Sequence, residues 1–457
     1  MERFATFELD KWIDSGNRKP LVIRGARQVG KTWLVRDLAK RHNLELIELN
    51  LERNPALSDL FAGNNPQDIL TNLEAEFEID IDPASSLLFL DEIQASPDLF
   101  AKLRWFREDL EELPLIAAGS LLEFALNNYQ FSMPVGRVSY FFMEPFSFLE
   151  FLKAVGNNAL SKKLTDFSPG GTIPESIHEK CLEKYHDYCF VGGMPEPLRE
   201  WADTGDMDGC LKIQQDLLAT FRDDFYKYGD KFDPGMLQKL FISVAKQIGS
   251  KFVVSQVDPS IGHSSIKKGL SLLSKARVFS KVFHTSGNGL PLGAESNEKF
   301  FKMLLIDTGL VSVQTGLSSI SRSQARDIIF ANKGGIAEQF AGQQIRAAQA
   351  PFSDPSLFYW QRTGGRQGEI DYIIQQGARI VPVEVKSGSA GSMKSLHQFM
   401  ADKNLDLAVR LDLNPPSVQR INVKTTKGEP VSYDLLSFPL YLAERIDPLI
   451  SNYLKNL

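Results

Sequence analysis

The sequence contains no apolar run approaching the roughly 20 residues that a membrane-spanning helix needs. Its first residues include the acidic Glu2 and Glu8, where a secretory signal peptide would be apolar. Only 3 cysteines occur in 457 residues, and their odd number and spacing suit neither a disulfide framework nor a metal site. We interpret them as reduced packing residues, and we expect a cytoplasmic protein without a membrane partner.

Internal repeats and low-complexity linkers are also missing from the sequence. With 43% hydrophobic and 24% charged residues, the composition is that of folded domains and gives no sign of disorder. A chain of 457 residues is too long for one ordinary hydrophobic core. Length therefore favours two to four domains.

The net charge of −6 conceals an uneven distribution of charge along the chain. Residues 1–230 contain 24 Lys and Arg against 39 Asp and Glu, whereas residues 231–330 contain 13 against 6. A basic middle segment in an acidic protein is typical of a surface that contacts a polyanion. The alternative is that the basic segment docks on the acidic first part of the same chain.

Strands and helices alternate in the first part of the sequence. We expect a helix from Trp33 to His42 and short apolar strands at residues 20–23, 44–49, 86–90 and 115–118. Continuously apolar strands that alternate with helices indicate a parallel sheet covered on both faces. The pattern turns helical from Phe146 to Tyr228.

A phosphate-binding loop lies between the first expected strand and helix. The motif G-x-x-x-x-G-K-[ST] is matched by Gly25-Ala26-Arg27-Gln28-Val29-Gly30-Lys31-Thr32, and Trp33 follows it. The glycines let successive backbone N–H groups face the phosphates at the start of a helix. We expect Lys31 to reach the β- and γ-phosphates of ATP and the Thr32 hydroxyl to bind Mg²⁺.

Two carboxylates end the apolar strand Leu87-Leu88-Phe89-Leu90. Such a strand end lies beside the phosphate loop in this fold, so we expect Asp91 to complete the metal site. Glu92 is then placed to polarise the attacking water, which predicts hydrolysis as well as binding.

Two further polar residues are candidates for sensing the nucleotide. Ser120 follows the strand at 115–118 and is predicted either to sense the γ-phosphate or to cap a helix. Arg137 is a candidate arginine finger for a neighbouring subunit, and the alternative is an ordinary surface arginine.

The sequence resembles the bacterial and archaeal AAA-type ATPases that carry a C-terminal domain of unknown function related to restriction endonucleases. The motifs that carry this resemblance are Arg24–Thr32, Leu90–Gln94, Gly192–Pro195 and Ile306–Leu310. The resemblance implies an ATPase core, a lid, a winged helix and a nuclease-like end. It also implies that Gly193 and Pro195, as a Gly-x-Pro of the lid, cover the nucleotide.

We therefore expect an α/β protein: a P-loop NTPase parallel sheet with a helical lid, a winged-helix domain and a C-terminal restriction-endonuclease-like α/β domain. The expected boundaries are 1–145 for the ATPase core, 146–230 for the lid, 231–325 for the winged helix and 326–457 for the last domain.

A second set of polar residues in the last domain resembles the site of restriction-endonuclease-like nucleases. Glu338 lies on an expected helix, Asp371 begins a strand, and Glu384 and Lys386 lie two apart on the next strand, hence on one face. The resemblance implies that Glu338, Asp371 and Glu384 bind Mg²⁺ or Mn²⁺ and that Lys386 acts on the scissile phosphate. The alternative is a solvated strand edge in a domain that only binds.

The basic segment is predicted to form two helices and a β-hairpin, which is typical of a winged helix. The second helix, from Ser264 to Ala276, carries Lys267, Lys268 and Lys275. Lysines at such positions add phosphate contacts to DNA, which is the interpretation we prefer. The alternative is a wing that docks against the ATPase and relays its nucleotide state.

These patterns predict an ATP-binding and ATP-hydrolysing AAA-type ATPase that uses Mg²⁺. Its nucleotide cycle is expected to control a DNA-binding C-terminal half, with DNA cleavage as a further expectation. The alternative is a nucleotide-dependent switch or scaffold that binds protein partners and carries an inactive nuclease-like domain. A homo-oligomer is compatible with either interpretation.

Overall fold

The structure is a computed structural model that describes residues 1–119, 136–227, 232–316, 334–362, 368–388 and 391–456. Within these ranges, no helix combines the length and the apolar composition needed to cross a membrane.

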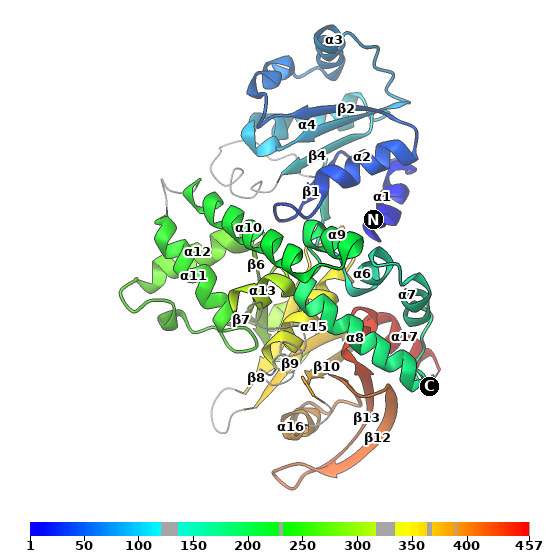
Figure 1. Cartoon of the computed structure of the whole chain (residues 1–457), viewed down its shortest axis with the longest axis vertical. Coiled ribbons are helices and arrows are strands. Elements are labelled where there is room, and N and C mark those ends of the chain that lie inside the picture. The colour runs from blue at the N-terminus through cyan, green and yellow to red at the C-terminus, as the bar shows by residue number, and fades with distance from the viewer. Residues whose placement is uncertain (120–135, 228–231, 317–333, 363–367, 389–390, 457) are drawn as a thin grey trace.

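A five-stranded parallel sheet lies at one end of the long axis of the molecule (Figure 1). Neighbouring strands follow the order β2-β3-β4-β1-β5, and every pair is parallel. The strands are β1 (Leu21–Arg24), β2 (Glu45–Asn50), β3 (Ser86–Asp91), β4 (Leu115–Gly119) and β5 (Ser139–Phe142). The first four strands confirm the sequence prediction, whereas β5 was not predicted. Because β1 lies between β4 and β5 and is parallel to both, the loop that follows β1 lies near the carboxyl ends of these two strands.

Helices cover both faces of this sheet. Leu21 and Ile23 of β1 pack into the layer that contains α1 (Ala5–Ile13) and α2 (Lys31–Arg41). Val22 points the other way, into the layer that contains α3 (Pro66–Phe77) and α4 (Asp98–Asp109). Two short 3-10 helices, η1 (Pro55–Phe61) and η2 (Ile93–Ala95), follow β2 and β3. This cover on two sides explains why the strands are continuously apolar.

The middle of the chain is helical, as predicted. Its helices are α6 (Phe148–Ala154), α7 (Asn158–Thr165), α8 (Glu175–Val191), α9 (Pro195–Thr204), α10 (Met207–Tyr226), α11 (Pro234–Lys246) and α12 (His263–Lys275). Figure 1 shows α9 and α10 between the parallel sheet and the rest of the molecule. The helix α6 begins with a capping box, in which Ser147 and Glu150 satisfy each other's backbone N–H groups.

A mixed eight-stranded sheet forms the second half of the molecule. Its order is β12-β13-β11-β10-β9-β8-β6-β7. The strands are β6 (Phe279–Thr285), β7 (Ser296–Leu305), β8 (Leu357–Gln361), β9 (Glu369–Gln376), β10 (Arg379–Val385), β11 (Leu407–Asp412), β12 (Ser417–Lys424) and β13 (Pro430–Pro439). The associated helices are η3 (Val254–Gln256), η4 (Leu292–Glu295), α13 (Thr308–Gln314), α15 (Gly335–Ala347), α16 (Lys394–Lys403), η6 (Leu440–Arg445) and α17 (Ile446–Lys455). Figure 1 shows the β12–β13 ribbon at the end opposite to α3.

The predicted hairpin β6–β7 is present, but it is not a free wing. β6 pairs in parallel with β8, with Val282 opposite Leu357, and this pairing makes the hairpin one side of the second sheet. The boundary expected between residues 325 and 326 therefore separates strands of the same sheet. Pairing with β8 satisfies backbone groups that a free hairpin edge would expose.

Candidate functional site

The phosphate loop runs from β1 to the start of α2, and its shape depends on two glycines. Gly30, the residue before α2, has a φ of 97°, which a residue with a side chain adopts only under strain. A Cβ at Gly25 would lie 2.7 Å from the backbone oxygen of Met143. Both glycines therefore allow a backbone arrangement that other residues would disturb.

Lys31 lies inside this loop. Its side chain is buried, and Nζ donates hydrogen bonds to the carbonyl oxygens of Gly25 (3.1 Å) and Ala26 (2.9 Å). Burial lowers the pKa of Lys31 to about 8, although the nearby Glu92 and Asp91 oppose this effect. The backbone of the phosphate loop therefore surrounds the Lys31 ammonium group.

The two carboxylates at the end of β3 lie beside the start of α2. The Thr32 hydroxyl donates a hydrogen bond to Asp91 Oδ2 at 3.1 Å. Burial, followed by repulsion from Glu92, raises the pKa of the Asp91 carboxyl. A hydroxyl and a carboxylate are the ligands that Mg²⁺ takes beside a nucleotide, so these two residues fit the expected metal.

Glu92 leaves the strand in a left-handed conformation, with a φ of 53°. Its Oε2 accepts a hydrogen bond from the side-chain amide of Gln94, which fixes the carboxylate near the loop. The side chain lines the same cavity as Lys31 and Thr32, where an attacking water would need its base.

The cavity above the phosphate loop has a volume of about 440 Å³ and lies between the loop and the lid. Its lining residues are Arg27, Gln28, Gly30, Lys31, Thr32, Trp33, Glu92, Pro195, Glu196 and Arg199. The expected Pro195 is among them, and so is Arg199, one turn further along α9, which the sequence analysis missed. A spacing of four residues on a helix places both on one face, and that spacing was the available signal.

Gly193 does not line this cavity. Its N–H donates to Asp307 Oδ2 at 2.6 Å, and its carbonyl oxygen accepts the N–H of Phe146 at 2.7 Å. A Cβ at this position would lie 2.1 Å from the backbone oxygen of Phe146. The glycine thus allows two backbone segments to approach each other and positions the start of α9 through Pro195.

The remaining expected residues of the first domain are placed as follows. Arg27 of the phosphate loop forms an ion pair with Asp224 of α10, which joins the loop to the lid. Arg137 forms an exposed ion pair with Glu108, with 2.6 Å between Nε and Oε1. Ser120 lies outside the described residues.

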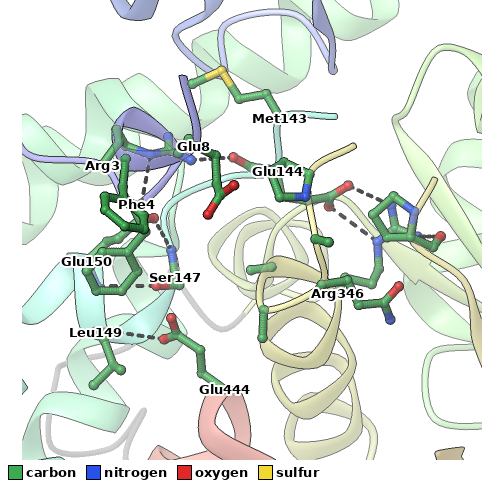
Figure 2. Close-up of a pocket in the computed structure, with 18 of the residues that line it drawn as sticks. Arg3, Phe4, Glu8, Met143, Glu144, Ser147, Leu149, Glu150, Arg346 and Glu444 are labelled. Carbon is green, nitrogen blue, oxygen red and sulfur yellow. Dashed lines mark hydrogen bonds and ion pairs between the residues drawn. The ribbon is translucent and has the colours of Figure 1, made fainter. Parts of the chain in front are cut away.

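A second, larger cavity of about 750 Å³ lies between the first domain and the C-terminal half (Figure 2). Arg3 is buried in its wall, with Nε 3.2 Å from Glu150 Oε1 and Nη2 2.7 Å from the backbone oxygen of Glu144. Arg346 of α15 donates to both carboxylate oxygens of Glu144, at 2.6 and 3.3 Å. Because Met143 pairs with the backbone of Arg24 at the end of β1, this bridge ties the phosphate-loop strand to α15.

The acidic residues of the last domain meet around a lysine that was not predicted. Glu338 of α15, Glu369 and Asp371 of β9 have carboxylate oxygens within 4.8 Å of one another. The Lys302 ammonium, from β7, lies 2.8 Å from Glu338 Oε2 and 3.4 Å from Asp371 Oδ1, and it also pairs with Glu369. Glu369 was detectable from its spacing of two residues from Asp371, whereas no local pattern marks Lys302.

The other expected residues of this region pair separately. Lys386 forms an ion pair with Glu384, and Asp371 Oδ2 accepts the N–H of Val385 at 2.8 Å. The described structure groups Asp371 with Glu338 and Glu369. Glu384 lies near this group, because burial and then repulsion from Asp371 raise the pKa of Glu384 to about 7. The Lys302 ammonium lies among Glu338, Glu369 and Asp371, where a divalent ion would otherwise bind.

Part of the basic middle segment is docked and part is exposed. Arg277 forms an ion pair with Asp354 of the last segment, and its guanidinium carbon lies 4.6 Å from the centroid of the Phe142 ring of β5. Lys267 and Lys268, called here the α12 pair, are exposed on their helix. Lys162 and Lys163 of α7, called here the α7 pair, are exposed in the same way and serve as a comparison.

Comparison with known proteins supports the assignment of the first domain as an ATPase domain. Residues 17–152 match the family model described as AAA domain. Residues 182–321 and 333–425 match two domains of unknown function, DUF8612 and DUF4143. No curated protein matches the chain. The family match, the parallel sheet and the phosphate loop together identify residues 17–152 as an AAA-type P-loop domain.

Solved structures with some likeness to the chain include three proteins. The Aeropyrum pernix ORC1 protein in complex with DNA is 12% identical, with 69% of this chain and 91% of that chain covered and a TM-score of 0.28. The Thermotoga maritima RuvB Holliday junction branch migration motor is 14% identical, with 61% and 88% covered and a TM-score of 0.30. The C. elegans PCH-2 is 12% identical, with 46% and 62% covered and a TM-score of 0.26. Likenesses with such low TM-scores support no functional inference about this chain.

Proposed function

We propose that this chain binds ATP and Mg²⁺ and hydrolyses ATP as an AAA-type ATPase. The observation that carries the proposal is the cavity that Lys31, Thr32 and Glu92 line beneath the lid, with Asp91 hydrogen-bonded to Thr32. A cation, a metal-binding pair and a carboxylate base are the groups that phosphoryl transfer to water requires.

Each part of the site has a proposed role. The backbone of residues 25–33 binds the phosphates, and Lys31 neutralises them. Thr32 and Asp91 bind Mg²⁺, which spreads the charge that develops on the phosphates, and Glu92 accepts a proton from water. Pro195 and Arg199 close the cavity from α9, with Arg199 adding positive charge at the phosphate side.

Two further residues have proposed roles at a nucleotide, Ser120 in its own chain and Arg137 in a neighbouring subunit. Ser120 is proposed to sense the γ-phosphate. Arg137 is proposed to leave its exposed pair with Glu108 and to reach the nucleotide of a neighbouring subunit in a homo-oligomer. An exposed ion pair contributes only about 0–1 kcal/mol, so exchanging this partner for a phosphate costs little.

The central test separates nucleotide binding from hydrolysis. Lys31→Ala is expected to abolish ATP binding, because it removes the ammonium from the loop. Glu92→Gln is expected to bind ATP with wild-type affinity and to hydrolyse it at least about 100-fold more slowly, which is the usual scale for losing a general base. Glu196→Gln changes a carboxylate of the same cavity and is the matched control, with expected wild-type turnover.

Binding by calorimetry and phosphate release over time measure these two steps. Wild-type turnover in Glu92→Gln would contradict the assignment of the base, and unchanged ATP affinity in Lys31→Ala would contradict the site itself.

We also propose that the nucleotide cycle controls DNA binding by the C-terminal half. The α12 pair supplies exposed positive charge, and the Arg27–Asp224 and Glu144–Arg346 ion pairs connect the phosphate-loop region to the lid and to α15. The Glu92→Gln variant, which retains ATP, allows the coupling to be measured. Its DNA affinity is expected to differ between the ATP-bound and nucleotide-free states, and equal affinities would contradict control by nucleotide.

The second candidate function is a nucleotide-dependent switch that binds a protein partner and carries an inactive nuclease-like domain. The docked position of Arg277 and the Lys302 ion pairs favour it. In this second function, Asp371, Glu384 and Lys386 take no part in DNA cleavage, because the Lys302 ammonium lies in the acidic cluster. The absence of salt-dependent DNA binding by the full chain would select this second function.

A further inference from the structure

Lys302 is a buried charge with an unusually complete set of partners. Its side chain is only 4% exposed, and its ammonium forms ion pairs with Glu338, Glu369 and Asp371. A lysine ammonium has three N–H donors, and the described structure supplies one carboxylate for each. A buried ammonium is costly unless it is paired in this way, so the cluster and the lysine require each other.

The same three carboxylates are arranged as a hard divalent cation would need them. One oxygen from each lies within 4.8 Å of the others, and Mg²⁺ and Mn²⁺ prefer oxygen ligands. Lys302 therefore lies where the positive charge of a metal ion would be expected in a nuclease-like centre.

The lysine and the carboxylates come from separate segments of the chain. Lys302 lies on the hairpin β6–β7, inside the segment 182–321 that matches DUF8612, whereas the carboxylates belong to the segment 333–425 that matches DUF4143. The parallel pairing of β6 with β8 places the hairpin next to β8, which in turn pairs with β9. The Lys302 side chain extends from β7 past Tyr359 of β8 to the carboxylates of Glu369 and Asp371.

We propose that Lys302 is a built-in counter-cation of the nuclease-like centre. Its ammonium takes the place of a divalent metal ion, so that the wild-type chain binds no such ion among Glu338, Glu369 and Asp371. This inference concerns the last domain and does not depend on the proposed ATPase activity.

The contacts around the ammonium hold it in this position. Lys302 pairs with Val282 in the β6–β7 ladder, and its Nζ lies 5.5 Å from the centroid of the Tyr359 ring. A divalent ion would have to displace an ammonium whose side chain is 4% exposed and is paired with three carboxylates. The Lys386 ammonium cannot take its place, because it is paired with Glu384.

The experiment measures Mn²⁺ binding to the full, nucleotide-free chain by calorimetry and by the electron paramagnetic resonance of free Mn²⁺. The variants are Lys302→Ala, the double variant Lys302→Ala/Asp371→Asn, and Lys299→Ala as the control. Lys299 lies on the same strand but is exposed, so its removal changes the net charge equally without opening the cluster. Any Mn²⁺ held weakly near the phosphate loop is common to all of these proteins.

Lys302→Ala is expected to bind one additional Mn²⁺ per chain at least tenfold more tightly than the wild type does. The double variant is expected to lose this site, and Lys299→Ala is expected to behave as the wild type. A folded Lys302→Ala protein that gains no Mn²⁺ affinity would overturn the proposal.

A second comparison, between the wild type and Asp371→Asn, does not depend on the folding of Lys302→Ala. Wild-type protein and Asp371→Asn are expected to bind the same amount of Mn²⁺, since the ammonium already excludes the ion. Mn²⁺ binding by the wild type that Asp371→Asn abolishes would show that the centre accepts a metal beside Lys302, and it would also overturn the proposal.

Discussion

We expect the buried carboxyl of Glu444 to make the stability of the junction between the two halves dependent on pH. Glu444 lies on η6 beside the larger cavity, and its Oε2 accepts the N–H of Leu149 at 3.0 Å, as Figure 2 shows. Burial, followed by repulsion from Glu150, raises the pKa of Glu444 to about 7 from its ordinary value of 4.5. The Leu149 N–H, the Ser147 hydroxyl and Arg445 oppose this rise.

A carboxyl with a raised pKa in the folded state retains its proton longer there than in the unfolded chain. Its contribution to stability is therefore fully present below pH 4.5 and is lost as the pH rises to about 7. One pKa unit corresponds to about 1.4 kcal/mol, so the folded state loses about 3 kcal/mol over this interval. Glu444→Gln keeps an oxygen for the Leu149 N–H but has no proton to lose, so it is expected to escape this loss.

Thermal unfolding of the full chain, followed by circular dichroism between pH 5 and pH 8, measures the effect. The melting temperature of Glu444→Gln is expected to exceed that of the wild type by an amount that grows from pH 5 to pH 7.5. Glu2→Gln is the control, because Glu2 lines the same cavity with an exposed side chain. A difference between Glu444→Gln and the wild type that stays constant with pH would refute the reasoning.

Two further outcomes are expected. Gly193→Ala should lower the melting temperature strongly, because the new Cβ would lie 2.1 Å from the Phe146 carbonyl oxygen. Gly16→Ala is the control and should leave the melting temperature unchanged, because a Cβ there has nothing within 4 Å. Equal melting temperatures for the two variants would contradict the close packing at Gly193. Replacing the α12 pair by alanine should weaken DNA binding and reduce the slope of log affinity against log salt by about 2, at roughly 0.9 per lost phosphate contact. The same change in the α7 pair should have no effect, and equal slopes for the two double variants would favour docking over DNA contact.

The sequence predicted those features whose signals are local. The phosphate loop, the strand ending in Asp91 and the hairpin β6–β7 are each encoded within a few consecutive residues, and all occur where expected. The strand β5 was missed because Ser139–Phe142 begins with a polar serine and is buried only in its second half, so it lacks the continuous apolar run that marked the predicted strands.

What could not be predicted depends on contacts between distant segments. Lys302 and Asp371 are 69 residues apart in the sequence. Nothing in the sequence around Lys302 distinguishes it from the other residues of its strand, because its contact with Asp371 depends on the pairing of β6 with β8. The partner of the hairpin is likewise set by tertiary packing, because no local pattern in the sequence indicates that β6 pairs with β8. Arg199, in contrast, could have been predicted from the sequence, because its spacing of four residues from Pro195 places both on one face of α9.

The pairing of β6 with β8 has a consequence for how this protein was assembled in evolution. The segments that match DUF8612 and DUF4143 contribute strands to one sheet, so neither segment has a complete set of strand neighbours by itself. A lineage that exchanged the last segment alone would leave β6 and β8 as open edges, which invite aggregation. The segments that match DUF8612 and DUF4143 are therefore expected to have been inherited together.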